Sequence, residues 1–128
     1  MGKKALIILN PCAGTKQANK YLVYIINLFC EAGYENTVFT TGKRGDGKDI
    51  AKKFANSVDI VVCIGGDGTL NEVISGVVES KIDVTIGYIP AGSTNDFANS
   101  MHLSKTIKRA TRDILEGEEK TLDIGSFN

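Results

Sequence analysis

One stretch, residues 60–73, constrains the fold more than any other part of the chain. Residues 60–64 form a continuous apolar run rich in β-branched side chains, which is typical of a strand buried on both faces of a parallel sheet. Beyond a group of glycines, Leu70, Val73 and Val77 recur at helical spacing. A buried strand that passes directly into an amphipathic helix predicts an α/β fold.

The turn between this strand and this helix is Gly65-Gly66-Asp67-Gly68-Thr69. Its glycines allow a ligand to approach the backbone without interference from a Cβ atom. The turn also ends at a helix N-terminus, where free N–H groups and the helix dipole favour an anion such as a phosphate. Because a carboxylate repels a bare phosphate, Asp67 makes most sense with a cation between the two, and Mg²⁺ often bridges carboxylates and phosphates. The alternative is a tight turn in which Asp67 only caps the helix.

The rest of the chain continues the alternation of strands and helices. This order predicts three layers, with a mostly parallel sheet, helices on both faces and right-handed crossovers. The predicted strands are residues 5–9, 35–40, 60–64, 83–89 and 120–127. The predicted helices are residues 17–32, a short helix containing Ile50 and Phe54, the helix that starts near Leu70, a helix containing Phe97 and Met101, and a helix from Ser104 to Leu115.

Three loops are predicted to meet at one edge of the sheet. They follow residues 9, 64 and 89, and each connects a strand to a helix. In parallel sheets the carboxyl ends of the strands share an edge, and ligands bind there. A fourth glycine-rich loop, residues 41–47, carries Lys43 and Arg44, which could reach a phosphate, although a solvated loop is the simpler interpretation.

Composition excludes several functional classes. Fifteen basic and 15 acidic residues balance, so the overall charge favours neither nucleic acid nor acidic membranes. No apolar run reaches the length of a membrane span, and no signal peptide is recognisable. The three cysteines lack metal-ligand spacing, and Cys30 and Cys63 are expected to be small core residues. A cytoplasmic protein is expected.

Four motifs follow one another along the chain. They are Asn10-Pro11 with Gly14, the segment Gly65-Gly66-Asp67-Gly68-Thr69-Leu70-Asn71-Glu72, the segment Pro90-x-Gly92-x-x-Asn95-Asp96-Phe97-Ala98, and Leu122-Asp123-Ile124-Gly125. In this order they resemble the nucleotide-binding half of the diacylglycerol kinase catalytic-domain family, which includes sphingosine, ceramide and bacterial lipid kinases. The resemblance spans nearly the whole chain and implies a Rossmann-like or phosphofructokinase-like nucleotide-binding domain.

The resemblance implies ATP and Mg²⁺ as ligands. Asp67, Asp96 and Asp123 would order the Mg²⁺ through water molecules. The residues implied to contact ATP are Asn10, Gly65, Gly66, Asp67, Gly68, Thr69, Gly92, Ser93, Asn95 and Asp96. One departure concerns Thr94, which stands where many relatives have glycine. If that position requires a positive φ, the loop must have a different shape here.

Relatives in this family carry a second, mainly β domain that supplies the general base and most of the lipid pocket. Residues 1–128 are expected to be the nucleotide-binding domain only. The function implied is transfer of the ATP γ-phosphate to a lipid hydroxyl, on diacylglycerol or a related lipid. Peripheral membrane contact would then belong to the full-length protein, and these residues alone are expected to be inactive.

Two alternatives stay open at this point. NAD kinases share the Gly-Gly-Asp-Gly-Thr motif, so an ATP-dependent kinase of that kind is one of them. The other is a non-catalytic nucleotide-binding module with a dehydrogenase-like or flavodoxin-like fold. The dinucleotide fingerprint Gly-x-Gly-x-x-Gly is not met, because Gly66-x-Gly68 is followed by Asn71.

Overall fold

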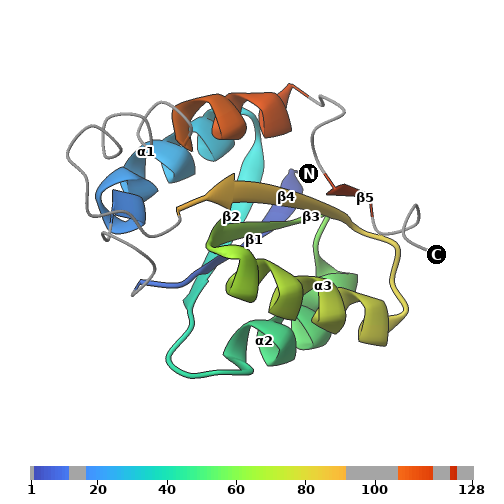
Figure 1. Ribbon diagram of the computed structural model, residues 1–128. Coiled ribbons are helices and arrows are strands. Elements are labelled where there is room, and N and C mark those ends of the chain that lie inside the picture. Colours follow the sequence, from blue (N-terminus) through green and yellow to red (C-terminus); the bar gives the residue numbers. More distant parts are fainter. Residues whose placement is uncertain (1, 12–16, 92–106, 117–121, 124–128) are drawn as a thin grey trace.

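The computed structural model describes residues 2–11, 17–91, 107–116 and 122–123. These residues form a five-stranded sheet with the strand order β2-β1-β3-β4-β5 (Figure 1). The first four strands are parallel to one another, and β5 pairs antiparallel to β4. The strands are β1 (Lys3–Leu9), β2 (Tyr34–Thr40), β3 (Ile60–Gly65), β4 (Thr85–Pro90) and β5 (Leu122–Asp123).

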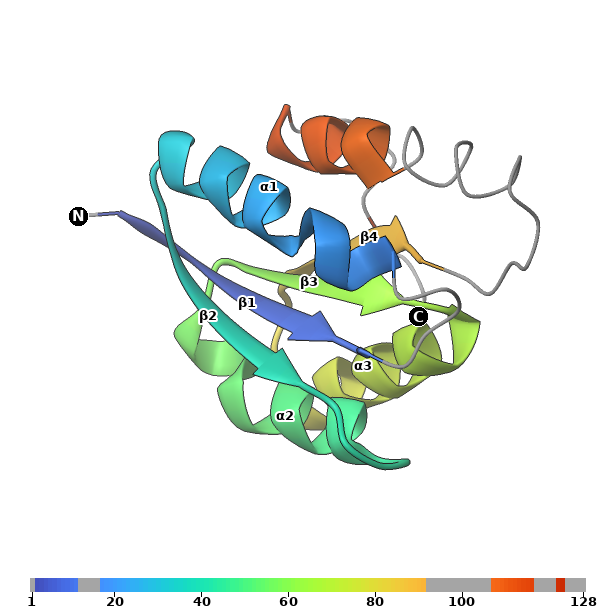
Figure 2. The same cartoon turned by 90° about the vertical axis from the view of Figure 1, so that its left-hand side faces the viewer.

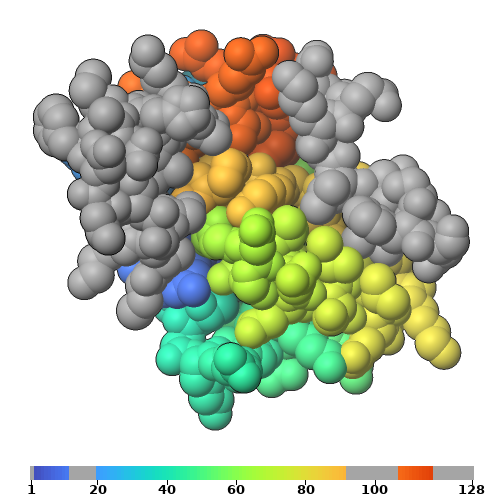
Figure 3. Space-filling model, in the orientation of Figure 1, coloured from blue at the N-terminus to red at the C-terminus, as the bar shows by residue number. Residues whose placement is uncertain are grey.

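Helices cover both faces of this sheet. The helices are α1 (Gln17–Glu31), α2 (Asp46–Phe54), the 3₁₀-helix η1 (Ala55–Ser57), α3 (Asp67–Ser80) and a helix over residues 107–115. Figure 2 shows α1 and the helix 107–115 on one face and α2 and α3 on the other. In the space-filling view, α2 and α3 form one continuous surface (Figure 3). The predicted three-layer α/β fold is confirmed, whereas the helix predicted around Phe97 lies outside the described residues.

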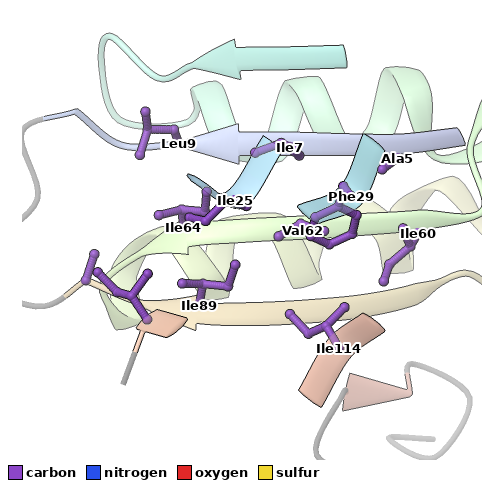
Figure 4. Packing of buried hydrophobic residues seen from close by; sticks show 12 residues of the cluster. Ala5, Ile7, Leu9, Ile25, Phe29, Ile60, Val62, Ile64, Ile89 and Ile114 are labelled. Carbon is purple, nitrogen blue, oxygen red and sulfur yellow. The ribbon is translucent and has the colours of Figure 1, made fainter. Parts of the chain in front are cut away.

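Two hydrophobic cores hold the layers together, one on each side of the sheet. Alternate residues of β1 divide between them: Ile7 packs toward α1 and the helix 107–115, and Ile8 packs toward α2 and α3. Every residue of β3 is buried, which explains its unbroken apolar sequence. Figure 4 shows the first core, with Ile25 and Phe29 of α1 over strands β1 and β3.

Cys30 differs from its prediction as a core residue. The buried positions of α1 are Ile25 and Phe29, four residues apart on one helical face. Cys30 follows Phe29 directly and is therefore turned away from that face, and its thiol is exposed. Cys63 of β3 is buried as predicted, and burial followed by the charge of Glu72 raises the pKa of its thiol to about 12.

No helix among the described residues is long and apolar enough to cross a membrane.

Candidate functional site

The space outside the carboxyl ends of β1 and β3, called the crevice below, lies at a switch point of the sheet. The two strands are neighbours and parallel, but β1 leads to α1 on one face and β3 leads to α3 on the other (Figure 2). In open α/β sheets, ligands bind at such a switch point, outside the carboxyl ends of the strands. The fold therefore favours ligand binding at the loops that follow Leu9 and Gly65.

Asn10 joins these two loops. Its backbone N–H donates to the carbonyl oxygen of Ile64 at 3.1 Å, and its Nδ2 donates to Oγ1 of Thr69 at 3.2 Å. Gly65 makes this approach feasible, because a Cβ there would lie 3.1 Å from Oγ1 of Thr69 and 3.4 Å from Cβ of Asn10. The contact places the Asn10 amide and the Thr69 hydroxyl side by side at the base of the crevice.

The start of α3 supplies backbone donors to the same crevice. The first bond within the helix runs from Leu70 N–H to the carbonyl oxygen of Gly66, at 3.1 Å. The N–H groups of the preceding residues, Asp67, Gly68 and Thr69, therefore have no partner within the helix. A Cβ added to Gly66 or Gly68 would meet nothing within 4 Å, so the space over these glycines is open. This arrangement suits an anion.

Asp67 is exposed and is the first residue of α3. The N-cap is Gly66, and no side chain makes a cap hydrogen bond at this helix start. The alternative in which Asp67 only caps the helix is therefore not supported. Its Oδ1 instead accepts a hydrogen bond from the Tyr88 hydroxyl of β4 at 3.4 Å. Partial burial, and then the charge of Asp67, raise the pKa of Tyr88 to about 12, so the hydroxyl keeps its proton and donates.

A pocket of about 240 Å³ extends from this crevice toward the loop between β2 and α2. Lys43 and Arg44 are exposed, as expected for a solvated loop, yet they also form part of the pocket wall. The sequence left contact with a phosphate open for these two residues, but it could not place them at a pocket because the loop was considered on its own. The lining residues are Asn10, Thr41, Gly42, Lys43, Arg44, Thr69 and Glu72.

The residues predicted to bind ATP fall into two groups. Those of the first two loops lie together: Asn10, Gly65, Gly66, Asp67, Gly68 and Thr69. The others lie outside the described residues: Gly92, Ser93, Asn95 and Asp96. The chain that leads into them is held at the crevice, because Ala91 N–H donates to the carbonyl oxygen of Gly65 at 2.9 Å.

Asp123 is described only through its backbone, which pairs with Thr85 at the amino end of β4. Because β5 is antiparallel to β4, it runs back toward that end of the strand. The role of Asp123 at the metal stays a prediction. Among the described residues, no group of three or more acidic, histidine or cysteine side chains could hold a metal ion.

Fold and crevice together define an α/β domain in which a helix start with free N–H groups lies open at the carboxyl edge of the sheet. A family model described as the diacylglycerol kinase catalytic domain matches residues 4–127. The chain therefore belongs to the diacylglycerol kinase catalytic-domain family. This result confirms the family predicted from the four motifs and disfavours the NAD kinase alternative.

Individual relatives agree with the family match. The chain is 37% identical to a diacylglycerol kinase of Staphylococcus saprophyticus, over all of this chain and 42% of that protein. It is also 37% identical to a diacylglycerol kinase of Bacillus subtilis, over 98% of this chain and 42% of that protein. A crystal structure of a diacylglycerol kinase from Bacillus anthracis superposes with a TM-score of 0.74 and 30% identity, covering 91% of this chain and 43% of that one. The chain thus spans less than half the length of these relatives.

Proposed function

We propose that this chain binds ATP with Mg²⁺ at the carboxyl edge of its sheet, as the nucleotide-binding part of a lipid kinase. The observation that carries the proposal is the open, donor-rich start of α3 beside the Asn10–Thr69 contact. In this arrangement the phosphates lie over Gly66 and Gly68 and accept from the N–H groups at the helix start. The nucleoside part then occupies the adjoining pocket, whose opposite wall is the loop 41–44.

The residues at the crevice fit a magnesium ion. Mg²⁺ prefers oxygen ligands, keeps several waters and often uses one or two carboxylates together with substrate phosphates. Asp67 offers one exposed carboxylate at the open side of the turn, and Asp96 is proposed as a second. When bound, the ion neutralises charge on the phosphates and so assists phosphoryl transfer. Asp123, whose backbone pairs with Thr85 of β4, is proposed as a third carboxylate that acts through water.

The acceptor is proposed to be a lipid hydroxyl, because the relatives that match this chain are named diacylglycerol kinases. Phosphoryl transfer depends mainly on positioning and charge stabilisation, and the acceptor must be held in line with the γ-phosphate. We propose that a second domain of the complete protein holds the lipid and supplies the general base, with peripheral contact to a membrane. Residues 1–128 alone are then expected to bind the nucleotide without phosphorylating a lipid.

Isothermal titration calorimetry of the 128-residue chain tests the proposal. We expect ATP and ADP to bind in the presence of Mg²⁺ and to bind at least about tenfold more weakly without it. NAD is expected to bind more weakly than either nucleotide, with no dependence on the metal. Binding of NAD that is tighter than that of ATP and independent of Mg²⁺ would overturn the proposed function.

A further inference from the structure

Glu72 connects the two walls of the pocket. It lies in α3, three residues after Thr69, and is half-buried. Its two carboxylate oxygens reach across to the loop before α2: Oε2 accepts from the N–H of Gly45 and Oε1 accepts from the N–H of Gly47, each at 3.1 Å. Both oxygens are therefore engaged by a backbone segment that is 25 to 27 residues away in sequence.

The same contact caps a helix. Gly45 is the N-cap of α2, has a φ of 94° and provides no side chain for the free N–H groups of this helix start. Glu72 supplies the missing acceptor from the neighbouring helix, and its negative charge also suits the positive end of the α2 dipole. Gly47 leaves room for the carboxylate, because a Cβ there would lie 3.0 Å from Oε1 of Glu72 and 3.3 Å from its Cβ.

Within the loop, Asp46 closes the turn. Its Oδ2 accepts from the N–H groups of Gly42 at 2.6 Å and Lys43 at 2.9 Å. These two bonds lower the pKa of the Asp46 carboxyl, so the carboxylate stays ionised and the turn stays closed at neutral pH. Asp46 thus shapes the loop, whereas Glu72 places the shaped loop against α3.

We infer that Glu72 is a positioning residue for the bound nucleotide. It holds the loop 41–47 at the distance from Thr69 that gives the pocket its width, and it acts through the loop because both of its oxygens are already engaged. The inference rests on the proposed function, since it assumes that the nucleotide occupies this pocket. If the loop were in place for only one tenth of the time, the apparent affinity would fall about tenfold.

Three variants of the 128-residue chain test this inference. Glu72→Gln keeps the size of the side chain but leaves one of the two N–H groups without an acceptor, and Glu72→Ala removes both contacts. Gly47→Ala disturbs the same contact from the loop side, because the new Cβ would lie 3.0 Å from Oε1 of Glu72. The matched control is Glu79→Gln, which removes the ion pairs of Glu79 with Lys48 and Lys52 between the same two helices and leaves the loop untouched.

Two readouts are needed, MgATP affinity by calorimetry and hydrogen exchange of the Gly45 and Gly47 amides. We expect Glu72→Ala to weaken MgATP binding about tenfold. Glu72→Ala should also speed hydrogen exchange of both amides. Glu72→Gln should have smaller effects of the same kind. Glu79→Gln should change neither the MgATP affinity nor the exchange of these amides. The effects of Glu72→Ala and Gly47→Ala should be non-additive, because Glu72→Ala removes the nearest atom that the new Cβ at position 47 would meet, Oε1 of Glu72 at 3.0 Å.

The two readouts distinguish a failure of this inference from a failure of the proposed function. Faster amide exchange with unchanged affinity would show that the loop does not control binding, and the proposed function would survive. Weaker binding with unchanged exchange would show that Glu72 touches the ligand directly, which also overturns the inference. A wild-type chain that binds no Mg²⁺-nucleotide would remove the proposed function and this inference together.

Discussion

The Asp67→Asn variant is expected to lose the Mg²⁺ dependence of ATP binding while it keeps its fold. The carboxylate is exposed, is not the N-cap of α3, and borders the open space over Gly66 and Gly68. Asparagine has the same size and can still accept from the Tyr88 hydroxyl, so only the charge is removed. We expect MgATP affinity to fall about tenfold or more, and the free energy of unfolding to change by less than about 1 kcal/mol.

Asp49→Asn is the matched control for this variant. Asp49 lies in the first turn of α2, as Asp67 lies in the first turn of α3, and it is exposed. Both substitutions therefore remove one charge from a helix N-terminus, but only one of them alters the crevice. Calorimetry with and without Mg²⁺ compares the two variants. An Asp67→Asn chain with the wild-type Mg²⁺ dependence would rule out the assigned role.

Gly76→Ala is expected to destabilise the fold more than any other glycine-to-alanine change within α3. At this position α3 crosses α2 so closely that a Cβ would collide with the carbonyl oxygen of Lys48 and lie 2.9 Å from Cβ of Ala51. The obstacle is backbone, which cannot rotate away. Overpacking of this kind costs about 1–3 kcal/mol, and the better helix propensity of alanine returns up to about 1 kcal/mol. We expect a net loss of about 2 kcal/mol in denaturant unfolding.

The same substitution at Gly68 controls for helix propensity. Gly68 is in the same helix, but a Cβ there would meet nothing within 4 Å. The Gly68→Ala variant should therefore be as stable as the wild type or slightly more stable, by up to about 1 kcal/mol. If Gly76→Ala were equally harmless, α2 and α3 would not be packed as closely as described.

Most of the fold could be predicted because its signals are local. The unbroken apolar run of β3 predicted a strand buried on both faces, and all six of its residues are buried. The sequence of β2 is more polar, which is typical of a strand nearer the edge, and β2 lies at one edge of the sheet. Gly33 follows the first helix, and its φ of 94° is the left-handed conformation in which many helices end at a glycine.

The central turn and Asn10 could be predicted as neighbours because loops after parallel strands share one edge of the sheet. The contact of Glu72 with the N–H groups of Gly45 and Gly47 could not be predicted, because it depends on how closely α2 crosses α3. Its one sequence signal is the pair of glycines on either side of Asp46. The Tyr88 contact likewise needs the register of β3 with β4. The antiparallel direction of β5 could not be predicted either, because the sequence of a short strand does not reveal its direction.

The most direct test of the central claim is to map MgATP binding on the 128-residue chain by NMR, following each backbone amide through a titration. The account predicts that the largest shifts fall on the turn and its neighbours, Gly65, Gly66, Gly68 and Thr69, and on Asn10. Smaller shifts should occur at the loop 41–47, and the amino ends of the strands, such as Lys3 and Ile60, should stay unchanged. Saturable shifts centred on the amino ends, with the turn unaffected, would contradict it.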